Sequence, residues 1–224
     1  AIVSTGDELL EPGEPHQPGK VYNSNAYSVA SAVLKYGGVP KVVGIARDTV
    51  ESLQAALDKA IAADMVVTSA GVSKGDYDVV KDVLSRRGKI ALWSVRMRPA
   101  KPLAFGFLDA PDGRKVPLLG LPGNPVSAMV AFEQFGRPAV HLMMGRKRLP
   151  RPTVRAVLDD PITNHDGRRV YARVIVYRDA SGVYRARTTG TQSSGALTSL
   201  AAANGLAICP EDLALINAGD TATV

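Results

Sequence analysis

Residues 116–127 read Val-Pro-Leu-Leu-Gly-Leu-Pro-Gly-Asn-Pro-Val-Ser, which is an apolar run, a glycine and proline turn, and the start of a helix. The apolar run Val116–Gly120 predicts a buried strand. Asn124 predicts a helix cap, and Pro125 suits the first helical turn, where a missing N–H does no harm. We therefore expect a helix over Pro125–Met144, and a strand that passes directly into a helix is the repeating unit of an α/β fold.

The same alternation of strands and helices extends toward the N-terminus. Apolar runs predict strands over Ala1–Ser4, Lys41–Ala46, Met65–Ser69, Ile90–Val95 and Leu103–Leu108. Helical periodicity and capping residues predict helices over Asn25–Tyr36, Val50–Ala62 and Asp78–Arg87. Together these patterns predict an α/β domain with a mainly parallel sheet over residues 1–145.

The remainder of the chain has a different pattern. Residues 146–152 are basic and contain two prolines, which predicts a linker. Short alternating runs then predict a small all-β domain over residues 153–224, with strands at Thr153–Leu158, Arg168–Tyr177, Val183–Thr188, Leu206–Cys209 and Thr221–Val224. Because Ala1 is not an initiator methionine and strand patterns reach both ends, we expect the chain to be a fragment of a longer protein.

The composition narrows the classes of function. The 224 residues are 46% hydrophobic and 21% charged, which fits globular domains with real cores rather than disorder. No apolar run reaches the roughly 18 residues of a membrane-spanning helix. The single cysteine, Cys209, excludes an internal disulfide framework and fits a cytoplasmic protein. A net charge of +6 with only 5% aromatic residues favours a small anionic ligand over nucleic acid or a membrane surface.

Two acidic loops are candidates for binding phosphate groups and a metal ion. The loop after Met65–Ser69 offers small residues, among them Ser73 and Gly75, beside two carboxylates, Asp76 and Asp78. Backbone amides in such a loop can cradle an anion, and carboxylate oxygens suit Mg²⁺. Asp48 follows a neighbouring strand and points to the same sheet edge. In the alternative interpretation, these carboxylates only cap the helices that follow them.

Three further segments carry chemistry-bearing residues. The loop 96–102 holds Arg96, Arg98 and Lys101 between prolines, which suits anion recognition, although a solvated basic turn is the alternative. Residues 4–8 follow the first strand, where turn chemistry explains Gly6 and Asp7 equally well. The loop 120–127 presents backbone amides and polar side chains at a positive helix end, and capping by Asn124 explains only part of this pattern.

Several enzyme classes are disfavoured. The three histidines, His16, His141 and His165, have no partner at metal-ligand or relay spacing, which argues against a zinc enzyme. Ser4 and Ser127 lack a neighbouring histidine, so a serine nucleophile is not expected. The glycine-rich loop also lacks the Walker and dinucleotide-binding spacings.

Five motifs together resemble the molybdopterin molybdenumtransferase family, the group of MoeA and the gephyrin E domain. They are Ser-Thr-Gly-Asp-Glu-Leu at 4–9, Asn-Ser-Asn at 23–25, Gly-Val-Ser-x-Gly-Asp-Tyr-Asp at 71–78, Arg-Pro-x-Lys-Pro at 98–102 and Gly-Leu-Pro-Gly-Asn-Pro-Val-Ser at 120–127. The resemblance implies a three-layer domain like MogA and MoaB followed by a barrel-like β domain, the last two of the family's four domains. It also implies insertion of molybdenum from molybdate into adenylyl-molybdopterin, with Mg²⁺-dependent release of AMP.

The resemblance assigns roles residue by residue. Catalytic roles fall on Asp48, Asp76, Asp78 and Lys101, and the three aspartates are the Mg²⁺ candidates. Molybdate would be bound by Arg98, Lys101, Arg173 and Ser194. The pterin and its phosphates would be bound by Thr5, Gly6, Asp7, Glu8, Ser73, Gly75, Gly123, Asn124 and Ser127. We expect Asp48, Asp78, Lys101 and Asn124 to line one crevice.

Three positions depart from the family pattern: Ala70 and Ala100 replace glycines, and Lys74 replaces an apolar residue. An alanine would force a shifted backbone where a positive φ is required. Two alternative functions remain, adenylylation of the pterin as in MogA and a non-catalytic scaffold as in gephyrin. The implied partners are a second copy in a full-length homodimer and a MogA-like adenylyltransferase. The fragment alone is expected to be inactive, because family active sites take residues from a domain of the partner subunit.

Overall fold

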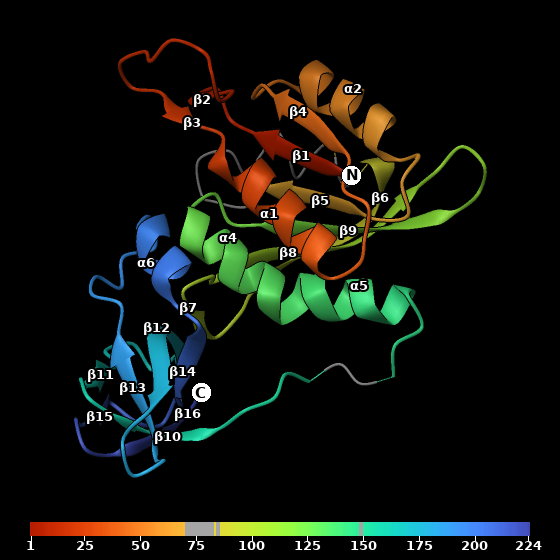
Figure 1. Cartoon of the computed structure of the whole chain (residues 1–224). Coiled ribbons are helices and arrows are strands. Elements are labelled where there is room, and N and C mark those ends of the chain that lie inside the picture. Colours follow the sequence, from red (N-terminus) through yellow and green to blue (C-terminus); the bar gives the residue numbers. More distant parts are fainter. Residues whose placement is uncertain (70–82, 84–85, 148–149) are drawn as a thin grey trace. The chain divides into compact units, whose positions relative to one another are not determined.

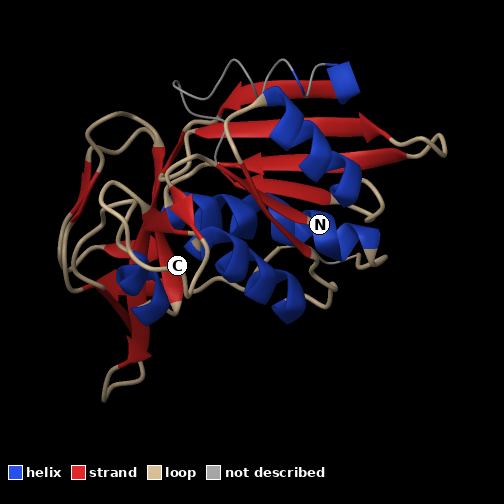
Figure 2. Ribbon diagram, turned by 90° about the horizontal axis from the view of Figure 1, so that it is seen from above, coloured by secondary structure: helices blue, strands red, loops and turns tan. Residues whose placement is uncertain are grey.

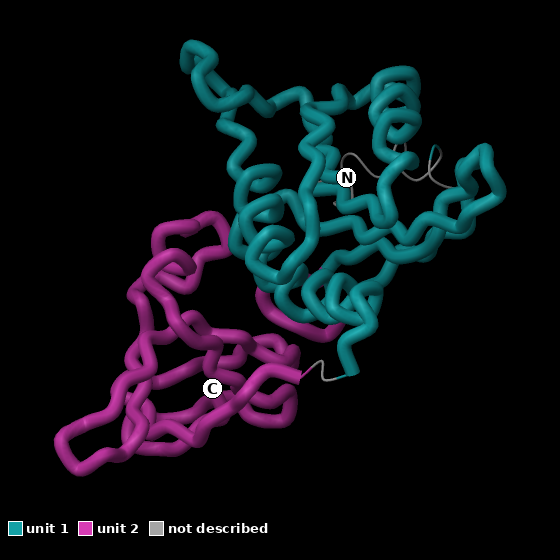
Figure 3. Tube along the Cα trace, turned by 45° about the vertical axis from the view of Figure 1, so that its right-hand side comes forward, with its two compact units in different colours: residues 1–94, 102–149 teal, residues 95–101, 150–224 magenta. Residues whose placement is uncertain are grey.

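The computed structural model describes residues 1–69, 83, 86–147 and 150–224. The chain divides into two compact units (Figure 3). Unit 1 comprises Ala1–Ser94 and Pro102–Leu149, and unit 2 comprises Val95–Lys101 and Pro150–Val224. The segment Val95–Lys101 therefore belongs to unit 2, whereas the sequence pattern placed it in the first domain. No helix of the described residues is long and apolar enough to cross a membrane.

Unit 1 is built on a six-stranded sheet (Figure 2). Its strands, in spatial order, are β4 (Val42–Ala46), β1 (Ile2–Thr5), β5 (Val66–Ser69), β9 (Lys115–Leu121), β8 (Pro102–Asp109) and β6 (Gly88–Ser94). The first four strands are parallel, and β8 is antiparallel to both β9 and β6. The expected mainly parallel sheet is confirmed, and a small parallel pair, β2 (Leu9–Leu10) and β3 (Val21–Tyr22), was not predicted.

Helices cover both faces of this sheet (Figure 1). The helix α2 (Val50–Ala60) packs on β4 and β1, and its Leu53 and Leu57 join Val3 in a buried core. The helix α1 (Ser24–Lys35) also packs on β1 and contacts α4 (Pro125–Ala131). Side chains alternate along β1, so Ser4 faces away from the Val3 core and contacts the N-cap of α1, Asn23.

The ends of these helices follow local capping chemistry. The Asn23 side chain accepts a hydrogen bond from the amide of Ala26, and α1 ends before Gly37, whose φ is +92°. Thr49 caps α2 by accepting from the amide of Ser52. The expected helix Asp78–Arg87 lies largely outside the described residues. Within this range the structure describes residues 83, 86 and 87, and all three are helical.

The last helix of unit 1 changes its winding midway. The predicted single helix comprises α4, a π-helical stretch, η1 (Phe132–Gly136), and α5 (Arg137–Met143). In η1 the amide of Arg137 donates to the carbonyl of Phe132, five residues earlier. Pro138 has no N–H to donate, and a wider turn beside it accommodates the missing bond.

Unit 2 is a small closed barrel. Its five strands are, in order of pairing, β12 (Arg169–Arg178), β13 (Tyr184–Thr188), β10 (Arg155–Leu158), β16 (Thr221–Thr223) and β14 (Gly205–Cys209), which pairs again with β12. The expected small all-β barrel-like domain is confirmed. Additional elements that the sequence did not predict are β7 (Met97–Arg98), β11 (Ile162–Thr163), β15 (Leu215–Ile216) and α6 (Leu197–Ala202).

Candidate functional site

One edge of the sheet in unit 1 collects the polar motifs. The parallel strands β1, β4, β5 and β9 all end at this edge, so the loops that follow them are neighbours. Open α/β sheets bind ligands at the carboxyl ends of their strands. The motif at 4–9, Asp48 and the motif at 120–127 all leave the sheet there.

A buried chain of hydrogen bonds links the ends of two strands to the start of a helix at this edge. The hydroxyl of Ser69 donates to Ser4 Oγ at 3.2 Å, and Ser4 Oγ donates to Asn23 Oδ1 at 2.8 Å. All three residues are at most 2% exposed. The Thr5 hydroxyl is also buried and donates to the carbonyl of Ser69 at 3.4 Å. The ends of β1 and β5 and the start of α1 are therefore fixed to one another below the surface of the edge.

Asp7 and Asp48 form a reciprocal pair at the same edge. The amide of Asp7 donates to Asp48 Oδ2 at 3.0 Å, and the amide of Asp48 donates to Asp7 Oδ1 at 3.3 Å. The second oxygen of each carboxylate has no hydrogen-bond partner among the described residues. Thr49 caps α2, so the alternative interpretation of Asp48 as that helix's cap is wrong. The pair brings two carboxylates together with an oxygen of each available to a ligand.

Basic side chains brace the turn that carries Asp7. Lys20 Nζ donates to the carbonyl of Asp7 at 2.6 Å, and Arg47 Nη1 donates to the carbonyls of Asp7 and Leu9 at 3.2 and 3.3 Å. Gly6 in this turn has φ +142°, and an added Cβ would meet the carboxylate of Glu8. Turn chemistry explains why a glycine stands at position 6, and the exposed Glu8 folds over it.

The Asn-Ser-Asn motif also fixes the loop before α4. Asn25 Nδ2 donates to the carbonyl of Gly123 at 2.8 Å, while Asn25 Oδ1 is buried with no partner in the part of the chain that the structure describes. Asn124 occupies the N-cap position of α4 and is exposed, but its side chain makes no capping bond. Ser127 lies in the first turn of α4 and is 5% exposed. Capping by the Asn124 side chain therefore does not explain that residue.

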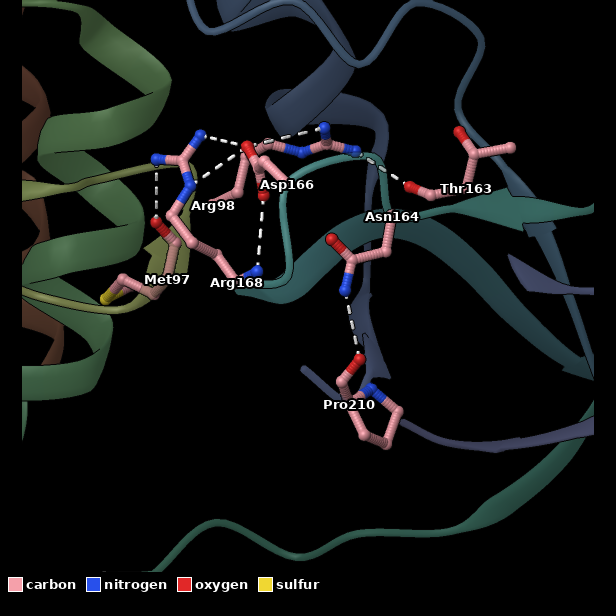
Figure 4. A network of polar contacts seen from close by, with 7 residues as sticks. All are labelled: Met97, Arg98, Thr163, Asn164, Asp166, Arg168 and Pro210. Atoms are coloured by element: carbon pink, nitrogen blue, oxygen red, sulfur yellow. Dashed lines mark hydrogen bonds and ion pairs between the residues drawn. The ribbon is translucent and has the colours of Figure 1, made fainter. Parts of the chain in front are cut away.

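The basic segment 95–101 lies in unit 2. Its strand β7 pairs in parallel with the start of β12, and the amide of Val95 donates to the carbonyl of Lys101 at 2.8 Å. Arg98 Nη2 donates to the carbonyl of Thr163 at 2.7 Å and lies near Asp166 (Figure 4). Lys101 is exposed, and its ammonium has no hydrogen-bond or ion-pair partner among the described residues. Ala100, which replaces a glycine of the family pattern, has a positive φ of +77°.

Arg173 and Ser194 lie together in unit 2. Arg173 is 1% exposed and donates to Ser199 Oγ and to the carbonyls of Thr191 and Ser193, at 2.9, 3.0 and 3.0 Å. Burial lowers the pKa of this guanidinium. Ser194 directly follows one of the carbonyls that Arg173 holds. Arg173 therefore shapes the loop that presents Ser194.

Several predicted site positions fall outside the described residues. Ser73, Gly75, Asp76 and Asp78 lie outside the described residues, as do the departures Ala70 and Lys74. Among the residues that are described, no group of three or more His, Cys, Asp or Glu side chains is placed to hold a metal. Of the four residues expected to line one crevice, Asp48 and Asn124 lie at the carboxyl edge of the unit 1 sheet, Lys101 belongs to unit 2, and Asp78 lies outside the described residues.

Comparison with known proteins assigns the chain to a family. The model of a probable molybdopterin binding domain matches residues 1–142, and that of the MoeA C-terminal region, domain IV, matches residues 155–224. A molybdopterin molybdenumtransferase 2 of Mycobacterium tuberculosis is 39% identical over 225 residues, which cover 97% of this chain and 54% of the relative. The chain belongs to the molybdopterin molybdenumtransferase family.

Other relatives agree with this family. The molybdopterin molybdenumtransferase of Nostoc is 38% identical over 98% of this chain and 50% of its own length. The solved structure of the molybdopterin biosynthesis MoeA protein of Pyrococcus horikoshii matches with a TM-score of 0.80 at 28% identity, covering 100% of this chain and 52% of that one. The resemblance read from the five motifs is confirmed. The chain spans about half the length of these molybdenumtransferase relatives.

Sequence reasoning did not assign a role to four residues of the unit 1 edge. Ser4, Asn23, Asn25 and Ser69 hold the motifs together. The signal was present, since the motifs at 4–9 and 23–25 contain three of them. Their hydrogen bonds, among themselves and with Gly123, span up to 98 positions and depend on the order of the strands, which local pattern does not give.

Proposed function

We propose that this chain forms part of a molybdopterin molybdenumtransferase that inserts molybdenum from molybdate into adenylyl-molybdopterin and releases AMP. The observation that carries the proposal is the convergence of the motif residues Ser4, Asp7 and Asn23, with Asp48, at one sheet edge of unit 1. The names of the relatives support the same activity. Because the chain spans half of those relatives, the proposal concerns the longer protein of which such a chain is part.

The carboxylates at this edge are proposed to hold Mg²⁺. The described residues fit an oxygen-ligated cation to the extent that Asp7 and Asp48 are adjacent and each keeps one oxygen without a partner among those residues. Asp76 and Asp78 remain proposed ligands from the sequence. When bound, Mg²⁺ would neutralise charge on the phosphate groups of the adenylylated substrate. The chain's own contribution is to hold the carboxylates in place through backbone amides.

The pterin and its phosphates are proposed to lie against the loops of the same edge. Thr5, Gly6, Asp7 and Glu8 would line one side, with Gly123, Asn124 and Ser127 on another and Ser73 and Gly75 completing the set. The helix that begins at Pro125 continues for 19 residues through α4, η1 and α5, so its amide end favours an anion. The exposed Asn124 amide, unused in capping, supports a role in binding ligand.

Molybdate, the substrate oxyanion, is proposed to be bound by groups of unit 2. Lys101 supplies an exposed ammonium, and Arg98 adds a second cation in the same short segment. Arg173 would act through the loop of Ser194, because its donors already bind carbonyls of that loop. Cleavage of the adenylyl group would then rely on charge stabilisation, without a protein nucleophile.

The two alternative functions are less well supported. Adenylylation of the pterin requires only a domain like unit 1, whereas this chain also carries the domain IV match. A scaffold role does not require the Asp7 and Asp48 pair. We also propose a cytoplasmic location, a homodimer of the full-length protein, and exchange of intermediate with a MogA-like adenylyltransferase. Small molecules, rather than nucleic acid or membrane, are the proposed ligands.

The test is AMP release by the full-length protein with adenylyl-molybdopterin, molybdate and Mg²⁺. Asp48→Asn keeps the size of the side chain but removes its charge, and we expect the rate to fall by about 100-fold or more. Asp64→Asn is the matched control, since Asp64 is an exposed carboxylate just before β5, at the opposite edge of the sheet. Unchanged AMP release in Asp48→Asn would remove the proposed role of this edge.

A further inference from the structure

The basic segment 95–101 is the tip of a hairpin whose arms belong to a different unit. The strands β6 and β8 of unit 1 pair from Gly88 with Leu108 up to Ser94 with Pro102. Beyond that pair, the chain enters unit 2, where Met97 pairs with Arg169 and Arg98 with Val170. Met97 and Ala100 are 3% and 4% exposed. The position of Lys101 is therefore set by contacts with unit 2.

Backbone and arginine contacts hold this tip to residues 163–169 of unit 2, a loop and the first residue of β12. The amide of Arg169 donates to the carbonyl of Arg96 at 3.0 Å, and Arg96 Nη2 donates to the carbonyl of Gly167 at 3.0 Å. From the loop, Arg168 Nη1 donates to the carbonyl of Met97 at 3.3 Å. The bond from Arg98 to the carbonyl of Thr163 completes the attachment.

Asp166 is the acidic group at the centre of these contacts (Figure 4). Its Oδ2 lies 3.9 Å from Arg98 Nη1 and accepts from Arg168 Nε at 2.9 Å, and its Oδ1 accepts from the amide of Arg168 at 3.2 Å. Arg168 Nη2 also forms an ion pair with Oδ2. One carboxylate thus binds an arginine from each side of the attachment. The side chains of Asp166 and Arg98 are about one-third exposed, at 34% and 33%.

The two cations proposed to bind molybdate are therefore not equivalent. The charge of Arg98 is offset by Asp166, and one of its amino groups is used by the carbonyl of Thr163. Lys101 has neither kind of partner among the described residues. A guanidinium committed to a carboxylate and a carbonyl suits an anchor, and an ammonium without a protein partner suits a ligand-binding charge.

We propose that Asp166 is a positioning residue that holds Arg98 and thereby fixes the segment from which Lys101 binds a tetrahedral oxyanion. Arg98 acts as the anchor of this segment, and Lys101 supplies the charge that contacts the anion. The inference rests on the proposed function in one respect, the binding of molybdate by this segment, and it changes the role of Arg98 there from direct contact with the anion to anchoring the segment. It adds a residue of unit 2 that the family motifs in the sequence do not contain.

Removal of the Asp166 carboxylate should change the affinity for molybdate in opposite directions under the two possible roles of Arg98. If Arg98 bound the anion directly, Asp166 would compete for its charge, and removing the carboxylate would tighten molybdate binding. If Asp166 positions the segment, removing it loosens the segment and weakens binding. The probe is sodium molybdate, titrated calorimetrically into the full-length protein.

Asp166→Asn is expected to weaken molybdate binding by about 5- to 10-fold, within the range found for residues that modulate binding without contacting the ligand. Glu211→Gln is the matched control, because it removes one negative charge from another ion pair of unit 2, with Arg169. It is expected to change the affinity by less than about 2-fold. Asp166→Glu, which restores the charge on a longer side chain, is expected to recover part of the loss.

A double substitution tests whether Asp166 acts through Arg98. In the Arg98→Met background, Asp166→Asn is expected to have no further effect on molybdate affinity. Amide hydrogen exchange provides a readout independent of function: in Asp166→Asn, exchange should accelerate at residues 96–98 and 166–169 and stay unchanged in β10 and β13. Unchanged exchange at those residues overturns the positioning role.

The failure of the two proposals can be told apart. If Lys101→Ala weakens molybdate binding but Asp166→Asn tightens it or leaves it unchanged, the positioning role is wrong and the proposed molybdate site stands. If neither Lys101→Ala nor Asp166→Asn alters binding, the segment is not a molybdate site, and both proposals are wrong. Weakening in both variants, with exchange accelerated only in Asp166→Asn, supports both.

Discussion

Asn23 connects a buried network to a helix start, and this double role predicts a large loss of stability in Asn23→Ala. Its Oδ1 caps α1 through the amide of Ala26 and accepts the hydroxyl of Ser4 at 2.8 Å. Loss of a helix cap costs about 1 kcal/mol. Leaving the buried Ser4 hydroxyl without its acceptor costs about 1–3 kcal/mol more. We expect the free energy of unfolding of unit 1 to fall by about 2–4 kcal/mol.

The assay is urea unfolding of the 224-residue chain followed by tryptophan fluorescence. Trp93 is the single tryptophan and lies in β6, so the signal reports unit 1. Thr49→Ala is the control, since Thr49 caps α2 by a comparable bond but is exposed. It should cost about 1 kcal/mol, the value of a cap alone. Equal losses in the two variants would refute the buried network as a stabilising contact.

Two further predictions concern unit 2, and both are measured by amide exchange, in β12 and segment 95–101 for the first and at residues 166–169 for the second. Ala100 is buried with φ +77°, so Ala100→Val should destabilise unit 2 by about 2 kcal/mol or more, since a β-branched residue is strained there and overfills the site. In Ala100→Gly, relief of strain is offset by the lost methyl group and a more flexible unfolded chain, so the change should stay within about 1 kcal/mol. If both variants behave alike, the backbone conformation at position 100 is not a constraint. The hydrogen bond from Arg168, with the charges of Arg168 and Arg98, holds the pKa of Asp166 below its usual range. A lowered folded-state pKa gives stability that is present above the unfolded pKa of about 3.9 and lost as pH falls through the folded value. Exchange at residues 166–169, corrected for the intrinsic rate, should therefore accelerate below about pH 4 in the wild type, whereas Asp166→Asn should show no such step; identical pH profiles would contradict the assignment.

Local patterns predicted the regular elements of unit 1 well, because burial and helix capping leave a signal in neighbouring residues. The apolar run 116–120 and the Asn124-Pro125 start both appear in the structure, as β9 and α4. The winding change in η1 was missed, since it depends on how a helix accommodates Pro138.

The pairing of strands that lie far apart in the chain could not be predicted from local sequence patterns. Met97 and Arg98 form a strand only because Arg169 and Val170, about 70 positions later, supply the partner strand. The sequence alone therefore placed Lys101 with the first domain, whereas its segment packs in unit 2. Two-residue strands between charged residues carry too little periodicity to be recognised.

In the candidate site, too, local features were predicted from the sequence and long-range contacts were not. The residue types at the sheet edge were predicted from the motifs, because small and acidic residues follow the strands in the sequence. The partners of those residues were not, since the pairing of Asp7 with Asp48 and of Ser4 with Asn23 follows from strand order. The structure rules out only the capping interpretation of Asp48, because Thr49 caps α2 instead.

The central claim is that the carboxyl edge of the unit 1 sheet binds the phosphate of the adenylylated substrate. The most direct measurement is amide hydrogen exchange of the full-length protein with and without AMP and Mg²⁺, the phosphate-bearing product and the proposed metal. Protection is expected at residues 5–9, at Arg47 and Asp48, and at residues 122–127, with none at the opposite edge near Asp64. Protection confined to other segments, at AMP concentrations that saturate binding, would contradict the account.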